Sequence, residues 1–227
     1  MTLQKMLALG ALVCAGFAHG SIAYDASLTN GVYYGTGNGG THFGWTVDSE
    51  SNIEIGLRAK LTTFTNPWID TPTNVYDVPT GFKTGTVNHS AWNYDFSIDL
   101  LASGDTFTAG PNQITATFRI KDLTNGDLII FNPLAIPDNA SNGNGKQNSE
   151  NPLFGGFGPN GGAGTLRGDY SVFGLDTYQF TLTLSNAGGQ IASDTILVNV
   201  TPEPSSIVLM LGGGLALFAA RRRIYTR

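Results

Sequence analysis

Hydrophobic and polar residues alternate with a period of two along much of the chain. The alternation runs through residues 52–61, 91–100, 114–121, 177–184 and 190–200. In residues 91–100, for example, aromatic and aliphatic side chains at every second position are separated by Asn, Asp and Ser. Because successive side chains of a strand point to opposite faces, each segment predicts an antiparallel β-strand with one face toward a core.

Turn residues separate several of these segments. Asn125-Gly126 lies between residues 114–121 and the apolar residues 128–130, and predicts a hairpin. Residues 185–189 (Ser-Asn-Ala-Gly-Gly) predict a second hairpin between the last two strands. Residues 132–169 are rich in Gly, Asn and Pro and predict a long loop. Since no helical period occurs between the two ends, we predict an all-β antiparallel sandwich of about eight to ten strands.

Residues 1–23 have the features of a secretory signal peptide. Lys5 supplies the positive charge, and residues 6–17 form an apolar run that is short for a membrane-spanning helix. Small residues at the spacing that signal peptidases require place the cleavage after Ala23, and a second set places it after Gly20. We therefore expect an N-terminal signal helix that is removed on export.

The C-terminal residues 201–227 combine an extended segment, an apolar run and a basic cluster. Pro202-Glu203-Pro204 restrains φ at both prolines and disfavours helix. Residues 207–220 are uncharged, and a helix of this length, roughly 21 Å, spans a thin or compressed membrane when the flanking arginines snorkel. Arg221, Arg222 and Arg223 predict a membrane stop on the cytoplasmic side, which places residues 24–200 outside as the ectodomain.

This C-terminal arrangement resembles the PEP-CTERM sorting signal of exported proteins in Gram-negative bacteria that make exopolysaccharide. The resemblance implies that an exosortase, a membrane-embedded processing enzyme, recognises Pro202, Glu203 and Pro204 and removes the tail. It also implies an inner-membrane intermediate and a final place at the cell surface or in the extracellular matrix. Thr201 departs from the usual pattern, which has Val before the first proline. A plain membrane anchor with a proline-rich stop is the alternative.

The distribution of charge excludes some classes of function. Twelve Lys and Arg oppose seventeen Asp and Glu in the 227 residues, and residues 24–200 alone hold seven basic and sixteen acidic side chains, a net charge of −9. This balance argues against a protein that binds nucleic acid through a basic surface. The single cysteine, Cys14, lies in the apolar run of the signal peptide, which excludes an internal disulfide or a cysteine-rich metal centre.

Few residues suggest catalysis. His42 and His89 are the histidines that remain after signal removal, too few for a three-histidine metal site. Asp95 and Asp99 fall on the solvent-facing side of a predicted strand, about 13 Å apart, which is too wide for a glycosidase pair. Residues 122–127 resemble half of a calcium loop, but a hairpin turn explains them better. We expect no catalytic residue, no cofactor and no metal site; structural calcium in the acidic loops, with ligands unidentified, is the alternative.

The tryptophans provide the remaining indication of function. Trp45 and Trp92 are expected in the core, whereas Trp68 follows Pro67 in a predicted loop, where an exposed ring could stack on a sugar or else cover the core edge. The sequence thus favours a non-enzymatic structural or adhesive surface protein associated with exopolysaccharide. A carbohydrate-binding module that uses Trp68 and residues 132–169 is the alternative, and a polysaccharide-degrading enzyme is a third.

Overall fold

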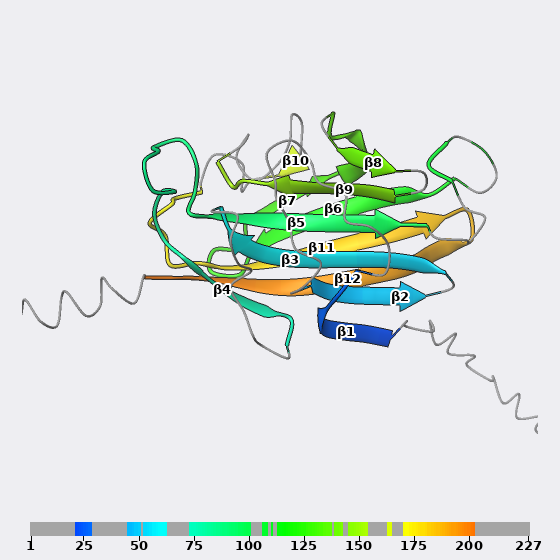
Figure 1. The fold of residues 1–227 in the computed structure, drawn as a ribbon, viewed down its shortest axis with the longest axis horizontal. Helices are drawn as coiled ribbons and strands as arrows, with labels where there is room; N and C mark the ends of the chain where they lie inside the picture. Colours follow the sequence, from blue (N-terminus) through cyan, green and yellow to red (C-terminus); the bar gives the residue numbers. More distant parts are fainter. Residues whose placement is uncertain are drawn as a thin grey trace, which may run out of the picture.

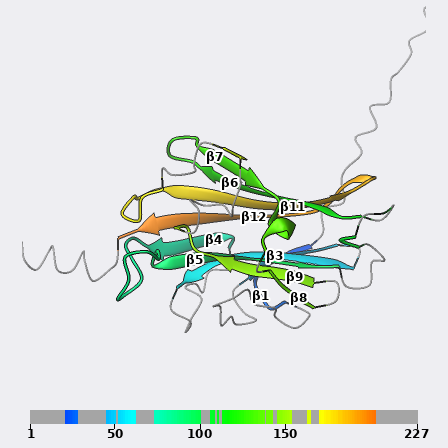
Figure 2. The same cartoon turned by 90° about the horizontal axis from the view of Figure 1, so that it is seen from above.

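Two β-sheets face each other in the protein. The computed structural model describes residues 21–28, 45–50, 52–62, 73–100, 106–108, 110, 113–137, 139–142, 145–153, 163–164 and 170–202. Twelve strands within these ranges form two six-stranded sheets, which overlap in the view of Figure 1 and appear as separate layers in Figure 2. The predicted all-β sandwich is therefore confirmed in its architecture, and the predicted strand number was too low.

The strand order in each sheet mixes segments that are distant in sequence. The first sheet contains, in spatial order, β1 (Ser21–Ala26), β2 (Trp45–Glu50), β3 (Ile53–Leu61), β5 (Trp92–Asp99), β9 (Gly145–Glu150) and β8 (Ala140–Asn142). The second contains β10 (Ala163–Gly164), β7 (Leu128–Phe131), β6 (Thr115–Asp122), β11 (Thr177–Asn186), β12 (Gly189–Thr201) and β4 (Val75–Pro79). A 3₁₀ turn, η1 (Pro133–Ala135), follows β7.

One strand pair departs from the antiparallel prediction. β4 pairs with β12 in parallel, from Leu197↔Val75 to Thr201↔Pro79. The chain leaves the first sheet after β3, contributes β4 to the edge of the second sheet, and returns to the first sheet as β5. Because β4 and β12 are far apart in sequence, no hairpin turn forces them to run in opposite directions.

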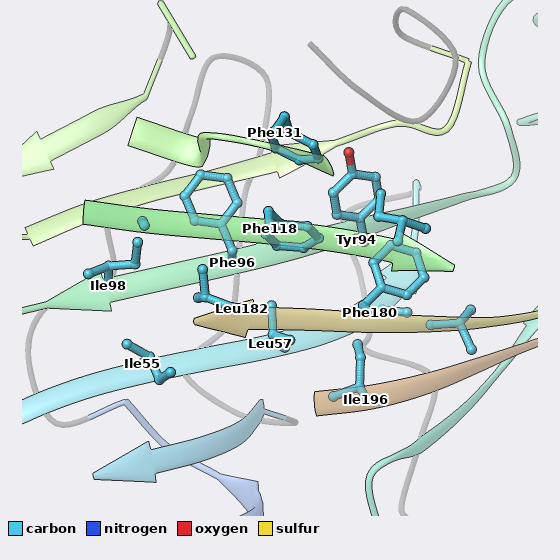
Figure 3. Packing of buried hydrophobic residues seen from close by; sticks show 14 of the residues in the cluster. Ile55, Leu57, Tyr94, Phe96, Ile98, Phe118, Phe131, Phe180, Leu182 and Ile196 are labelled. Carbon is cyan, nitrogen blue, oxygen red and sulfur yellow. The ribbon is translucent and has the colours of Figure 1, made fainter. Parts of the chain in front are cut away.

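The alternating segments form the core between the two sheets. Their apolar faces meet in one cluster of buried side chains, in which Phe118 stacks on Phe131 and Tyr94 packs against Phe180, each with ring centroids 5.0 Å apart (Figure 3). Trp92 is fully buried in this cluster, as predicted. Trp45 is also fully buried, but it belongs to a smaller cluster with Leu28 and Val47. Burial of this apolar surface is the main stabilising term for the sandwich.

Both predicted hairpins are present. Gly126 adopts φ +87° between β6 and β7, and the Asp122 side chain accepts the N–H of Thr124 at 2.7 Å. Gly189 adopts φ +117° at the turn between β11 and β12. A positive φ costs glycine little because it has no Cβ, which is why these turns were visible in the sequence.

The prediction of a single long loop over residues 132–169 was wrong. This segment contains η1, β8, β9 and β10, and β9 lies inside the first sheet, paired with β5 from Tyr94↔Glu150 to Asp99↔Gly145. The sequence of β9, Gly-Lys-Gln-Asn-Ser-Glu, is polar throughout, yet all of it except Lys146 is buried. A strand without apolar alternation carries no periodic signal, so composition indicated a loop.

The outer face of the first sheet is buried rather than solvated, which corrects the expectation for Asp95 and Asp99. The Arg58 Nε donates to Asp95 Oδ2 at 2.7 Å, and Lys60 Nζ lies 3.1 Å from the same oxygen. Burial alone would raise the pKa of Asp95, but Lys60 and Arg58 lower it below its usual value. The Arg58 guanidinium also lies over the Trp45 ring, 4.3 Å from its centroid. Charges on this face can therefore be buried because they are paired.

The predicted signal and membrane helices lie mostly outside the described residues. Residues 1–20 and 203–227 are not described, whereas Ser21–Ala23 of the predicted signal peptide form the first half of β1. These three residues pair with Ser49, Asp48 and Val47 of β2. Within the described ranges, no helix has the length and apolar character to cross a bilayer.

Candidate functional site

The C-terminal strand leads directly into the predicted sorting segment. β12 ends at Thr201, and the exposed Pro202 is the next residue. Val200 is buried in the core, and its N–H donates to the carbonyl of Asp176 at 2.9 Å. The N–H of Thr80, just after β4, donates to the carbonyl of Thr201 at 2.9 Å. The tail therefore leaves from a strand that both of its neighbours hold in place, with no spacer between the sandwich and the first proline.

The other predicted site residues cannot be placed. Those that lie outside the described residues are Trp68, Glu203, Pro204, Arg221, Arg222 and Arg223. Pro202 is the member of the predicted sorting motif that the structure places, and it is exposed at the end of the second sheet.

A hydrogen-bonded loop lies next to the point where the tail leaves. The loop connects β4 to β5 and closes on itself through a bridge between Phe82 and Ser90. The Ser90 N–H donates to Asn151 Oδ1 at 2.8 Å, and the Ser90 hydroxyl lies 2.8 Å from the hydroxyl of Tyr170. Burial raises the pKa of Tyr170 to about 12, so its hydroxyl stays protonated at neutral pH. Asn151, whose side chain also donates to Asn93 at 2.7 Å, lies in no motif that the sequence alone indicates.

The outer face of the second sheet carries mostly hydroxyl and amide side chains, together with Arg119, Lys121 and Leu197. The residues on this face that alternate with the core positions of β6, β11 and β12 include Thr115, Thr117, Arg119, Lys121, Thr177, Gln179, Thr181, Thr183, Ser193, Thr195 and Asn199. The strand register places them in rows across the sheet, and we call this surface the threonine face. Its β6 positions are exposed, and its β11 and β12 positions are partly exposed.

Side-chain hydrogen bonds order the threonine face. The hydroxyls of Thr181 and Thr195 lie 3.1 Å apart, and those of Thr183 and Ser193 lie 3.3 Å apart. Neighbouring strands are spaced by about 4.8 Å and residues on one face by about 6.7 Å, so these side chains lie in regular rows. Each hydroxyl can both donate and accept a hydrogen bond. Sequence periodicity identified this side of the strands as polar, but only the register aligned the rows.

Two buried carboxylates, those of Asp48 and Asp194, lie between the two sheets. Asp48 on β2 is 3% exposed and Asp194 on β12 is fully buried. Asp48 Oδ2 accepts the N–H of Ser193 at 3.0 Å. Burial, with a contribution from the Asp48 carboxylate, raises the pKa of Asp194 well above its usual value. The pair lies where a polymer substrate has no access, so its chemistry bears on stability.

The part of the chain that the structure describes contains no candidate metal site. These residues contain no group of three or more His, Cys, Asp or Glu side chains arranged to hold an ion. The segment 122–127 forms the β6–β7 turn, in which Asp122 Oδ1 accepts the N–H of Thr124 at 2.7 Å and Asn125 Oδ1 accepts that of Asp127 at 2.8 Å. These side chains stabilise the turn, as the sequence analysis expected.

Comparison with known protein families identifies the C-terminal segment. Residues 200–223 match the model of the PEP-CTERM protein-sorting motif. No curated protein and no solved structure matches the chain. The chain therefore carries a PEP-CTERM sorting motif, as the resemblance predicted, and this motif implies an exported protein that an exosortase processes at the membrane of a Gram-negative bacterium. The matched segment begins with Val200 and Thr201, the last two residues of β12, so the motif and the fold overlap.

Proposed function

We propose that this protein is a non-enzymatic component of the cell surface or extracellular matrix, with a structural or adhesive role in association with exopolysaccharide. Before processing, residues 207–220 hold the chain in the inner membrane, and Arg221, Arg222 and Arg223 stay on the cytoplasmic side. The sorting motif supports the route. The observation that supports the association with polysaccharide is the threonine face, whose partly exposed rows contain hydroxyls such as those of Thr181 and Thr195.

Arg119 and Lys121 favour a polymer that carries acidic sugars. Both lie on β6 within the threonine face, and both are exposed. Guanidinium groups bind carboxylates through two parallel hydrogen bonds, and lysine adds a point charge. Each contact is weak in water, so affinity would come from many contacts along one chain.

The test of sorting is a variant in which Pro202→Ala and Pro204→Ala are combined. Loss of both prolines frees the backbone next to the membrane, so we expect an unprocessed, membrane-retained form. Intact mass and fractionation of cells and medium measure this. Thr201→Val, which restores the residue usual in the motif, is the control and should be processed normally. Normal release of the double variant would contradict sorting through this motif.

The test of polysaccharide association is affinity electrophoresis of the released protein in gels that contain acidic or neutral polysaccharides. Thr181→Val combined with Thr183→Val removes two hydroxyls while nearly keeping side-chain shape, so retardation in the gel should fall or disappear. Thr108→Val, at an exposed position between β5 and β6, is the matched control and should migrate like the native protein.

Two other outcomes separate the alternatives. If Trp68→Ala abolishes retardation and the threonine variant does not, the protein is a carbohydrate-binding module that uses the loop. New reducing ends or unsaturated sugars after incubation with the polysaccharide would instead identify a degrading enzyme.

A further inference from the structure

Exposed apolar side chains gather at one end of the sandwich. Among the described residues, seven large hydrophobic side chains are exposed, and five of them, Phe82, Val87, Leu123, Phe173 and Leu175, belong to turns at the end where β12 finishes. The most exposed are Val87 (82%), Phe173 (67%) and Leu175 (62%). We call these five residues the apolar tip. The other two exposed residues, Ile22 and Tyr24, lie on β1 at an edge of the first sheet.

The backbone places the apolar tip beside the point where the tail leaves. The Gly81 N–H donates to the carbonyl of Val172, which brings the next residues, Phe82 and Phe173, into an edge-to-face contact with ring centroids 5.6 Å apart. Leu175 precedes Asp176, whose carbonyl accepts the N–H of Val200. In Figure 1, β12 (orange) runs to this end, and the loop between β4 and β5 lies at the same end.

Leu123 completes the tip from the far side of β11. Its N–H donates to the carbonyl of Thr177 at 2.8 Å, at the start of β11. Since β11 and β12 are antiparallel, Thr177 pairs with Asn199, two residues before Thr201. Five apolar side chains from three separate connections thus share the end of one sheet.

The turns that carry the tip are held by hydrogen bonds. The Lys83 N–H donates to the carbonyl of His89, and the Ala91 N–H donates to that of Gly81, both at 2.9 Å. Asn151 and Tyr170 bind Ser90 at the base of the same loop. The apolar side chains are therefore held outward by an ordered support, at a cost in water of about 25 cal/mol for each Å² of exposed apolar surface.

The tail leaves little distance between this end and the membrane. Four residues separate Pro202 from the apolar residues 207–220. A fully extended chain spans at most about 3.6 Å per residue, so Pro202 lies within about 18 Å of the start of the apolar run. The interfacial zone of a bilayer is itself several ångströms thick on each side. The tail of an anchored sandwich is therefore short enough to let the tip reach this zone.

We propose that the apolar tip rests in the lipid–water interface of the membrane that holds the tail. The inference depends on the proposed function, in which residues 207–220 enter the membrane. Phe, Leu and Val gain free energy by leaving water for the interface, and Lys83 on the same loop can reach lipid phosphates. The exposed Asp77 nearby opposes attraction to anionic lipid, so apolar contact is the stabilising term. Contact at the tip would orient the sandwich and bring Pro202 to the level of a membrane-embedded processing enzyme.

The experiment uses the mature chain without its signal peptide, residues 21–227, which contains no cysteine, reconstituted in vesicles of phosphatidylcholine and phosphatidylethanolamine. Val87→Cys carries an environment-sensitive fluorophore, and a lipid with a nitroxide at the headgroup serves as quencher. We expect a blue shift and quenching at Val87. The matched control, Ile22→Cys on β1, should show neither, because it lies far from the tip. Both positions are exposed, so labelling leaves the core intact.

A second variant tests whether the tip as a whole makes the contact. Phe173→Ser combined with Leu175→Ser should abolish the blue shift and the quenching at the Val87 label. Ile22→Ser combined with Tyr24→Ser should leave them unchanged. Persistence of both signals in the Phe173 and Leu175 variant would overturn the role given to the tip.

The outcomes separate this inference from the proposed function. Vesicle flotation reports whether the tail inserts: a chain that fails to float with vesicles contradicts the membrane intermediate itself. A chain that floats, with the Val87 label unquenched, overturns only the tip contact. A blue shift that occurs without quenching, and that grows with protein density, would show that a second copy covers the tip. A blue shift seen only when the processing enzyme is present would show that the enzyme covers it. Either result overturns the lipid contact.

Discussion

Single side chains in this protein show how charge can be placed inside a sandwich. Asp95 is buried with two cationic partners, Arg58 and Lys60, which lower its pKa although burial opposes this. Asp194 is buried beside another acid, Asp48, and burial raises its pKa. The first carboxyl is charged in the folded state because its partners compensate the loss of water. The second holds its proton more tightly on folding because burial removes water from the carboxylate, and the negative charge of Asp48 adds to this effect.

The raised pKa of Asp194 predicts a pH-dependent gain in stability for Asp194→Asn. A carboxyl whose pKa is raised on folding binds its proton more tightly in the folded state, so it destabilises the fold at pH values above its unfolded pKa of about 3.9. The penalty grows by about 1.4 kcal/mol per pH unit until the folded pKa is reached. The variant should therefore raise Tm more at about pH 7.5 than at about pH 5, as measured by calorimetry.

The control for this prediction is Asp127→Asn in the β6–β7 turn, which is partly exposed. It should change Tm by the same small amount at both pH values, since surface substitutions usually stay within about 0.5 kcal/mol. If Asp194→Asn behaves in the same way as this control, the assignment of a raised pKa to Asp194 is wrong.

Individual strands show where the alternation of apolar and polar residues predicts structure correctly. β5, β6, β11 and β12 match the predicted segments within a residue or two, because each has one apolar face. β9 was missed because its residues are polar and are buried by pairing with β5 and β8. β4 pairs in parallel with β12, and no local pattern in the sequence predicts this pairing.

β1 gives a prediction about signal removal. Ser21, Ile22 and Ala23 pair with β2, so cleavage after Ala23 would remove half of the strand, whereas cleavage after Gly20 leaves it whole. We expect the mature chain to begin at Ser21, because the complete pairing shields the edge of β2. Intact mass of the exported protein measures this, and a mature chain that begins at Tyr24 would contradict it.

The two proposed contact surfaces lie on different sides of the molecule. The threonine face lies along the side of the second sheet, and the apolar tip lies at the end where the tail leaves. A sandwich that stands on its tip would hold the threonine face roughly upright and accessible from the periplasmic side. The same geometry would then serve both steps, because the tip positions the sorting motif and the open sheet remains free for polymer.

Local signals along the chain were sufficient for the strand periods, for the turns at Gly126 and Gly189, and for the sorting motif. These properties depend on neighbouring residues: side-chain alternation, positive φ at glycine, and a run of apolar residues beside arginines. The motif was predicted in full, whereas the threonine face and the apolar tip were not.

The remaining features arise from contacts between distant segments. The place of β9 beside β5, the parallel edge strand β4, and the burial of Asp95 among Arg58 and Lys60 all require strands separated by tens of residues to pair. Such pairing is chosen by the total burial and hydrogen bonding of the folded chain, and no short stretch of sequence contains that sum. The apolar tip is of the same kind, since its five residues meet only when three connections end at one edge.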